Sequence, residues 1–225
     1  MQVKLTPISL SFPPGMGRVN CYLYQTASSF LLIDTGSSFN RKSLVKALEG
    51  AGCTPGQLRL IVITHGDFDH TGNAAYLRKT FGGEILMHKD DLGMVEAGDM
   101  FFNRHPPSPL IGKLIRLFGG FGKAERFTPD WLVEDGYDLS AYGLEAKVIS
   151  IPGHSKGSIG ILTASGDLFC GDLLVSTNGP TLNSLMDDLP AAQLSLHKLF
   201  RLGVETVYPG HGKPFPLRLV QAGEP

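Results

Sequence analysis

Residues 64–70 read Thr-His-Gly-Asp-Phe-Asp-His and place four possible metal ligands within six residues. They directly follow the apolar run 58–63, which predicts a buried strand. Two imidazoles and two carboxylates at the end of such a strand are costly to bury unless something compensates them. A bound cation is the simplest compensation, and the alternation of His65, Asp67 and Asp69 can aim three ligands at one point. The stretch therefore predicts a metal site, with a solvated polar loop as the alternative.

Three further segments repeat this design, because each places a possible ligand beside a glycine that follows an apolar run. They are 149–154, which ends in His154; 168–172, which ends in Asp172; and 204–212, which contains His211. The repetition favours the metal site over the polar loop.

The order of these residues resembles the metallo-β-lactamase-fold superfamily, whose pattern is His-x-His-x-Asp-His followed by a His, an Asp and a His. The likeness covers nearly the whole chain, because other short segments also match: 20–23 and 33–36 before the motif, and 153–155, 171–172 and 209–212 after it. Asp67 departs from the pattern, since it stands where the family usually has its second His.

The resemblance implies a site for two divalent metal ions in a metal-dependent hydrolase. By this correspondence His65, Asp67 and His154 hold one metal, Asp69, His70 and His211 hold the second, and Asp172 bridges them. Two such ions would supply a bridging hydroxide as the nucleophile and polarise the substrate. Asp69 could also shuttle a proton. The expected substrate is a small molecule: an ester, thioester, lactone or phosphodiester.

The carboxylate of Asp67 affects which metal is expected. With Asp69 and Asp172 it gives the site three carboxylates, which neutralise more of the metal charge and favour harder cations. Iron and manganese are therefore expected as rivals of zinc.

Two other functions remain open. A carboxylate at position 67 also resembles flavodiiron oxygen reductases, so a non-haem di-iron redox protein that works with a separate flavin donor is an alternative. The other is a metal-binding module without turnover. The predicted nuclease domain of competence-channel proteins has Asp at this position too, but it acts on DNA.

Residues 33–36 read Ile-Asp-Thr-Gly, which also looks like the active-site turn of aspartic proteases. Such a protease needs a second turn of this kind and a longer chain. The superfamily resemblance instead implies that Asp34 accepts hydrogen bonds beneath the metal site.

Hydrophobic periodicity alone predicts a mixed α/β fold, and the resemblance implies a four-layer αββα sandwich with the site at one edge between two sheets. The predicted strands are 2–12, 19–25, 30–33, 58–63, 84–87, 143–151, 158–163 and 167–170. The predicted helices run from Ser37 or Ser38 to about residue 50, from 71 to 81 and from 190 to 201.

The length of 225 residues predicts a single metallo-β-lactamase-like domain, 1–225. Residues 98–127 show no regular hydrophobic period and contain many phenylalanine, proline and glycine residues, so they predict an inserted segment. This segment is expected to be either a lid over the metals or a dimer contact. His105 lies within it and could meet the substrate.

Charge and composition restrict the possible partners. With 20 basic and 21 acidic residues the net charge is −1, so no attraction to nucleic acid or anionic membrane is indicated. No segment approaches the roughly 18 apolar residues of a membrane span. The start has no apolar run of signal-peptide length, and the three cysteines are an odd, widely spaced set. We therefore expect a cytoplasmic protein with reduced thiols.

Overall fold

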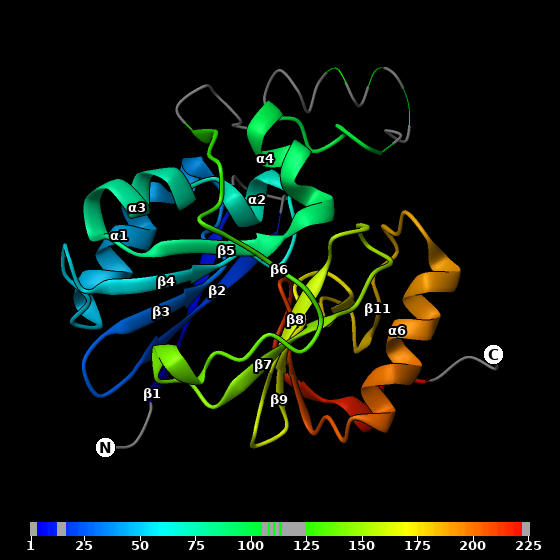
Figure 1. The fold of residues 1–225 in the computed structure, drawn as a ribbon. Helices are drawn as coiled ribbons and strands as arrows, with labels where there is room; N and C mark the ends of the chain where they lie inside the picture. The colour runs from blue at the N-terminus through cyan, green and yellow to red at the C-terminus, as the bar shows by residue number, and fades with distance from the viewer. Residues whose placement is uncertain are drawn as a thin grey trace.

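A computed structural model of the chain describes residues 4–12, 17–104, 108, 110, 113 and 125–221. These residues form two β-sheets that face each other, with helices on both outer sides (Figure 1).

The first sheet contains the first six strands in sequence order. They are β1 (Lys4–Ser11), β2 (Arg18–Gln25), β3 (Phe30–Ile33), β4 (Leu58–Val62), β5 (Glu84–His88) and β6 (Trp131–Val133). The pairings β1–β2 and β2–β3 are antiparallel, and the pairings from β3 to β6 are parallel. Strands β3 and β4 therefore end at the same edge, where Asp34 and the motif 64–70 follow them.

The second sheet has the order β13-β12-β9-β8-β7. Its strands are β7 (Ala146–Ser150), β8 (Ile159–Thr163), β9 (Asp167–Phe169), β12 (Thr206–Tyr208) and β13 (Phe215–Pro216), and β10 (Leu174–Val175) pairs separately with β11 (Thr181–Leu182). Because β9 and β12 are parallel, Asp172 and His211 both follow strands that end at one edge.

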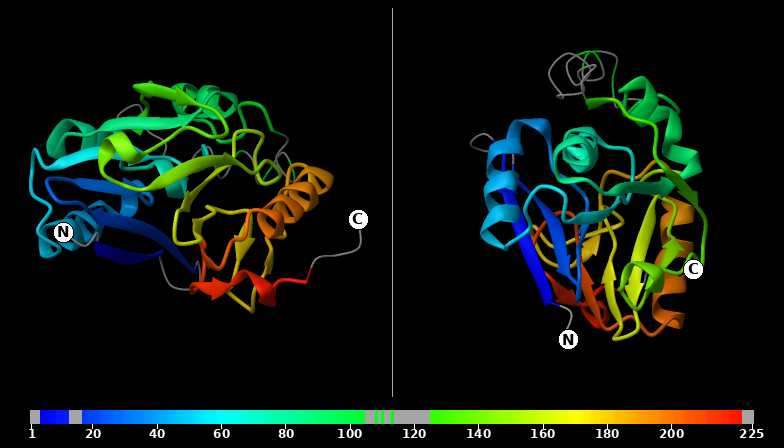
Figure 2. Two further views of the ribbon diagram at one scale, coloured as in Figure 1. Left: turned by 60° about the horizontal axis from the view of Figure 1, so that its bottom comes forward. Right: turned by 60° about the vertical axis from the view of Figure 1, so that its left-hand side comes forward.

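Helices complete the outer layers. They are α1 (Arg41–Gly50), α2 (Phe68–Thr71), α3 (Ala74–Phe81), α4 (Leu92–Ala97) and α6 (Leu189–Arg201), with the short 3₁₀ helices η1 (Ser38–Asn40), η2 (Lys89–Asp91), η4 (Ser140–Tyr142) and η5 (Leu217–Leu219). Figure 2 shows α1 and α3 over one sheet and α6 over the other. Among the described residues no helix has the length and apolar character to cross a membrane.

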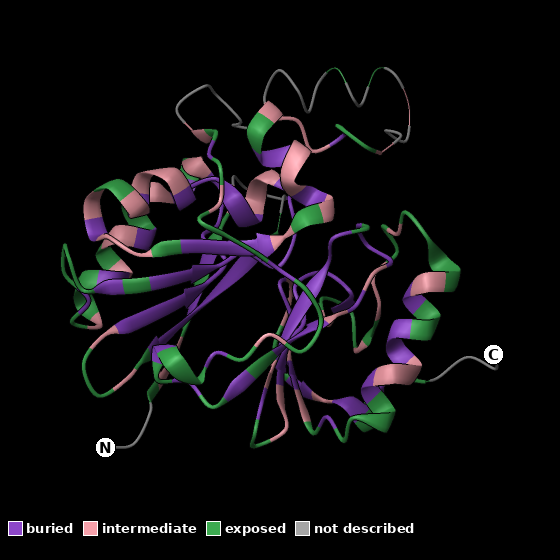
Figure 3. Cartoon of the chain, in the orientation of Figure 1, coloured by how far each residue is buried: buried purple, intermediate pink, exposed green. Residues whose placement is uncertain are grey.

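Three apolar layers separate these four layers of structure. Alternate residues of β3 show the division: Phe30 and Leu32 pack toward the layer with α1 and α3, whereas Leu31 and Ile33 pack into the layer between the sheets. A third layer joins the second sheet to α6. Figure 3 shows that most residues of the strands in both sheets are buried. The predicted αββα sandwich is therefore confirmed.

The predicted helix 71–81 is found as α3, but it begins only at Ala74, because Thr71 is the last residue of α2 and a break separates the two helices. Asn73 lies at the break, and its amide donates to the carbonyls of Thr35 (2.7 Å) and Ser37 (2.9 Å). A Cβ on Gly72 would lie 2.5 Å from the Ser38 nitrogen. This close attachment to the loop after β3 interrupts the helix, and no periodic pattern could reveal it.

The segment 98–127 is described only in part, and His105 lies outside the described residues. Phe127 packs into the core beside α1 and α3, while Phe101 is buried. Phe102 is 60% exposed and lies against α4, where a Cβ on Gly93 would be 2.2 Å from its ring. Phe127 is thus a core residue, and the lid or dimer role of the rest stays a prediction.

Candidate metal centre

The seven predicted ligands converge on one place, where loops from both sheets meet. His65 and Asp67 follow β4, His154 follows β7, and Asp172 and His211 follow β9 and β12. Asp69 and His70 belong to α2, whose N-cap position is Asp67. The structure therefore brings together all seven residues found in the sequence.

A first group contains His65, His154 and Asp172, whose ligand atoms all lie within 4.8 Å of one another. All three residues are buried. Asp67 Oδ2 lies 3.1 Å from His154 Nε2 and 3.8 Å from His65 Nε2. Ligands of one tetrahedral metal ion are about 3.3–3.6 Å apart. Asp67 Oδ2 is therefore also placed to share a metal with the two imidazoles.

A second group contains Asp69, His70 and His211, whose ligand atoms again lie within 4.8 Å of one another. Asp172 lies between the two groups: its Oδ1 is 3.3 Å from His70 Nε2, and its Oδ2 is 3.3 Å from His211 Nε2. This carboxylate can therefore contact ions in both positions.

All four imidazoles are oriented in the same way, because each Nδ1 is hydrogen-bonded to an acceptor outside the ligand cluster. The acceptors are Thr64 Oγ1 for His65 (2.9 Å), Asp34 Oδ2 for His70 (2.8 Å), the Leu185 carbonyl for His154 (2.6 Å) and the Arg18 carbonyl for His211 (2.6 Å). Carbonyl and carboxylate oxygens carry no proton, so Nδ1 of His70, His154 and His211 donates and Nε2 faces the cluster. The Thr64 hydroxyl donates its own proton to Asp34 Oδ2, so it accepts from Nδ1 of His65. Metal-binding histidines are typically held in this manner.

Unsatisfied polar atoms provide a direct test of whether the residues fit a metal. Among the described residues five buried side-chain atoms have no hydrogen-bond partner, and three of them are His65 Nε2, His70 Nε2 and Asp172 Oδ1. Buried atoms of this kind are normally paired, because leaving them unpaired is costly. Cations at the two positions would satisfy all three, so the residues fit divalent metal ions.

Charges within the cluster shift several pKa values. Burial alone would lower the pKa of His211, but Asp172 and Asp69 outweigh it and raise that pKa to about 11. Burial is likewise outweighed at His70, where Asp172 and Asp34 raise the pKa well above its usual value. Burial, followed by the neighbouring imidazoles, lowers the pKa of His65. Without a metal, protons on imidazoles balance the carboxylates.

Asp34 accepts three hydrogen bonds beneath the motif, as predicted. Its Oδ1 accepts from the Thr64 nitrogen, and its Oδ2 accepts from Thr64 Oγ1 and His70 Nδ1, each at 2.8 Å. Among the described residues it is the only non-glycine residue with positive φ (58°). This strained backbone is held by bonds that fix two motif residues.

Asp91 is a buried residue of the site region that sequence reasoning missed. It accepts hydrogen bonds from the nitrogens of Gly66 and Gly157, each at 2.9 Å, and from Ser155 Oγ at 2.6 Å. It thereby joins the motif loop to the loop that carries His154. Its sequence neighbourhood, Lys-Asp-Asp, looks like an exposed polar stretch and gives no signal of this role.

Arg104 is the second residue that sequence reasoning missed. Its guanidinium forms an ion pair with Asp67 Oδ1, donates to the His154 carbonyl at 3.0 Å and lies 2.6 Å from Asp187 Oδ2. The Arg104 side chain is only 9% exposed. One arginine from the start of the segment 98–127 thus contacts two of the candidate ligand residues.

Steric crowding explains why glycines stand beside the candidate ligands. A Cβ on Gly210 would lie 2.3 Å from Asp172 Oδ1, and one on Gly171 would lie 2.5 Å from Thr64 Oγ1. Gly171 also has a φ of 51°. Only glycine lets these loops approach the cluster so closely.

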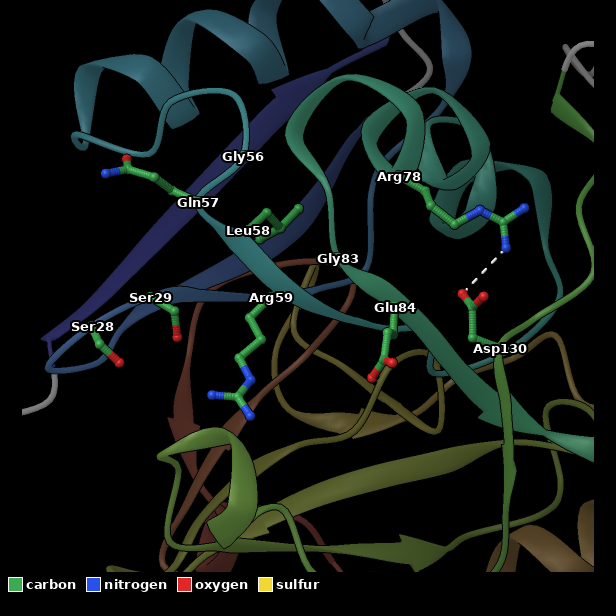
Figure 4. Close-up of a pocket in the computed structure, with 10 residues that line it drawn as sticks. All are labelled: Ser28, Ser29, Gly56, Gln57, Leu58, Arg59, Arg78, Gly83, Glu84 and Asp130. Atoms are coloured by element: carbon green, nitrogen blue, oxygen red, sulfur yellow. Dashed lines mark hydrogen bonds and ion pairs between the residues drawn. The ribbon is translucent and has the colours of Figure 1, made fainter.

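A separate polar cleft of about 740 Å³ lies at the opposite ends of β4 and β5 (Figure 4). It is lined by residues such as Gln57, Arg59 and Arg78, and Arg78 pairs there with Asp130 at 3.2 Å. None of the seven candidate ligands lines it, so this cleft is not the metal centre.

Comparisons with known proteins agree with this geometry. A family model described as the metallo-beta-lactamase superfamily matches residues 14–211. Metallo-beta-lactamase domain-containing protein 1 of Homo sapiens is 30% identical over 223 residues, which cover 95% of this chain and 69% of that protein. Hydroxyacylglutathione hydrolase GloC of Haemophilus influenzae is 28% identical over 177 residues, 77% of this chain and 72% of that protein.

Solved structures are similar as well. A crystal structure of TTHA1623 in a di-iron-bound form superposes with a TM-score of 0.69 at 27% identity, covering 95% of this chain and 96% of that one. The family model matches most of the chain, and GloC and two further relatives are named as hydrolases or probable metallo-hydrolases. These findings show that the chain is a metal-dependent hydrolase of the metallo-beta-lactamase superfamily.

Proposed function

We propose that the chain binds two divalent metal ions and hydrolyses a small thioester, with esters, lactones and phosphodiesters as further candidate classes. The convergence of His65 Nε2, His70 Nε2 and Asp172 Oδ1 as buried atoms without hydrogen-bond partners carries the proposal. The similarity to hydroxyacylglutathione hydrolase GloC, whose name denotes a thioester hydrolase, supports the substrate class.

The chain contributes the ligands and their fixed orientation. His65, Asp67 and His154 would hold the first ion, Asp69, His70 and His211 the second, and Asp172 would contact both. Two bound ions lower the pKa of a shared water and polarise the substrate. Outer hydrogen bonds such as those to Asp34 and to the Leu185 carbonyl keep the imidazoles aimed at these positions.

Asp69 is the residue proposed to move a proton. Its Oδ2 lies 3.4 Å from His211 Nε2, and its side chain is 16% exposed, more than that of His70 or Asp172. A carboxylate at the solvent side of the cluster can accept a proton from the attacking water and deliver it to the leaving group.

The structure corrects the charge count made from the sequence. Asp67 is paired with Arg104, so the three carboxylates and one guanidinium together carry two negative charges rather than three. The electrostatic argument for iron or manganese over zinc is therefore weaker than the sequence indicated. Iron stays a candidate with zinc and manganese, because the structure of TTHA1623 is described as di-iron-bound.

That di-iron-bound relative also keeps the redox alternative open. A non-haem di-iron redox protein would reduce oxygen or nitric oxide when supplied with a flavin electron donor. Stopped-flow spectroscopy of the iron-loaded protein with such a donor distinguishes this function from hydrolysis.

The cytoplasmic location and the homodimer stay predictions.

Hydrolysis of hydroxyacylglutathione thioesters is the direct test of the proposed function. We expect the metal-loaded protein to act on them with a kcat/KM above about 10⁴ M⁻¹ s⁻¹. Loss of thioester absorbance measures the rate, and His70→Ala provides the inactive control. A protein with two bound ions that is inert toward all four substrate classes would refute the proposal.

Metal binding is expected to release protons and to strengthen as the pH rises. The raised pKa values of His70 and His211 mean that both imidazoles are protonated near pH 7 without metal. Both must lose a proton to bind a cation, and Asp67 outweighs burial to raise the pKa of His154 as well, so two or more protons should leave per protein. Calorimetry of zinc binding in buffers of different ionisation enthalpy measures this number. Binding that is independent of pH between 6 and 8 would contradict the expectation.

A further inference from the structure

Arg104 lies beside the first metal position and is held on several sides. Among the described residues its polar contacts reach Asp67, the His154 carbonyl and Asp187. The Asp67 side chain is 8% exposed, so water screens this ion pair poorly. The Asp187 side chain is 33% exposed and more open to solvent. The strongest electrostatic partner of the guanidinium is therefore Asp67.

The ion pair divides the two oxygens of Asp67 between different neighbours. Oδ1 contacts Arg104, whereas Oδ2 faces His154 and His65. The guanidinium thus occupies one side of the carboxylate and leaves a single oxygen for a metal. An imidazole, the usual residue at this position in the superfamily, would also offer one donor atom and no net charge.

No matching cation contacts the second position among the described residues. Asp69 lies 3.4 Å from His211 and 4.0 Å from His70, and within the described part of the chain it forms ion pairs only with these imidazoles. In that part of the chain the two positions therefore differ by one fixed positive charge. A fixed positive charge a few ångströms from a divalent cation repels that cation, and the repulsion is strong where solvent is largely excluded.

We propose that Arg104 is a resident counter-charge that limits Asp67 to one donor oxygen and weakens the first metal position, so that the second position binds a divalent cation more tightly. The inference rests on the proposed metal-binding function and goes beyond it. By this inference Arg104 helps to determine the order in which the two ions bind. The ion in the first position would then exchange with solution more readily than the ion in the second.

The test is zinc affinity measured by competition with a chromophoric chelator. His211→Ala disables the second position, so binding in this background reports the first position. Adding Arg104→Met should tighten zinc binding on the order of tenfold or more. Adding Arg104→Lys keeps the positive charge and should leave the affinity within about threefold of the background. A cavity of about 220 Å³ beside Arg104 gives the replacement side chains room.

Arg78→Met is the matched control, because Arg78 also pairs with an aspartate but lies at the distant cleft of Figure 4. It should leave zinc affinity unchanged. Circular dichroism and thermal melts confirm that each metal-free variant is folded. The cobalt absorption spectrum of each variant checks that His65 and His154 still bind.

Two results would overturn the proposal. One is unchanged or weaker binding in folded Arg104→Met, which would make Arg104 only a support for the His154 loop. The other is equal tightening by Arg104→Lys and Arg104→Met, which would exclude charge as the cause. Absence of zinc, iron(II) and manganese(II) binding in the wild-type chain would instead refute the proposed function itself.

Discussion

Asp172→Ala is expected to remove both metal ions and to reduce hydrolysis on the order of a thousandfold or more. Asp172 directs one oxygen toward His70 and the other toward His211, and it also belongs to the group with His65 and His154. Its loss removes a negative charge from both positions, and metal-assisted stabilisation of the transition state is worth several kcal/mol. Elemental analysis and the rate of thioester hydrolysis measure the two effects.

Asp167→Ala is the matched control for this prediction. Asp167 is in β9, five residues before Asp172, and its side chain accepts a hydrogen bond from Ser165 at the turn. Metal content and activity should stay near the wild-type values. If Asp172→Ala retained two ions with nearly unchanged activity, Asp172 would not contact either metal, and the assignment of a shared carboxylate would be wrong.

The candidate ligand positions could be predicted because each lies in a short segment that follows an apolar strand. Local sequence determines where a strand ends, and parallel pairing brings the ends of β3 and β4, and of β9 and β12, to common edges. The order of the candidate ligands along the chain therefore indicated that they meet at one site. The strands β6 and β13 were not predicted, because their three and two residues are too few for a periodic pattern.

Arg104 could not be predicted from the same reasoning. It is 37 residues from Asp67 along the chain and lies in a segment whose composition shows no period. An arginine in such a segment is usually solvated, whereas here it is buried by its contacts with Asp67, the His154 carbonyl and Asp187. The candidate ligands were readable from the sequence, but the charge of the site depends on partners that only tertiary structure brings near.

The final prediction concerns Asp34, which contacts no metal in the proposed site. Asp34→Ala should weaken binding at the second position by about 10–100-fold, because His70 loses the acceptor that orients it. It should also lower the free energy of unfolding of the metal-free protein by about 3 kcal/mol or more. The buried donors of Thr64 and His70 lose their partner, and alanine tolerates a φ of 58° poorly. Chelator competition measures the affinity, and urea denaturation measures the stability.

Asp34→Asn separates the two parts of this prediction. Asparagine tolerates the left-handed backbone and keeps the side-chain shape, but it removes the negative charge that faces His70 Nδ1. We therefore expect a smaller loss of stability than with alanine, together with a clear loss of metal affinity. If Asp34→Asn bound zinc as tightly as the wild type, the orientation of His70 would depend only on packing. If Asp34→Ala were as stable as the wild type, the strained backbone at Asp34 would not be maintained by its three hydrogen bonds.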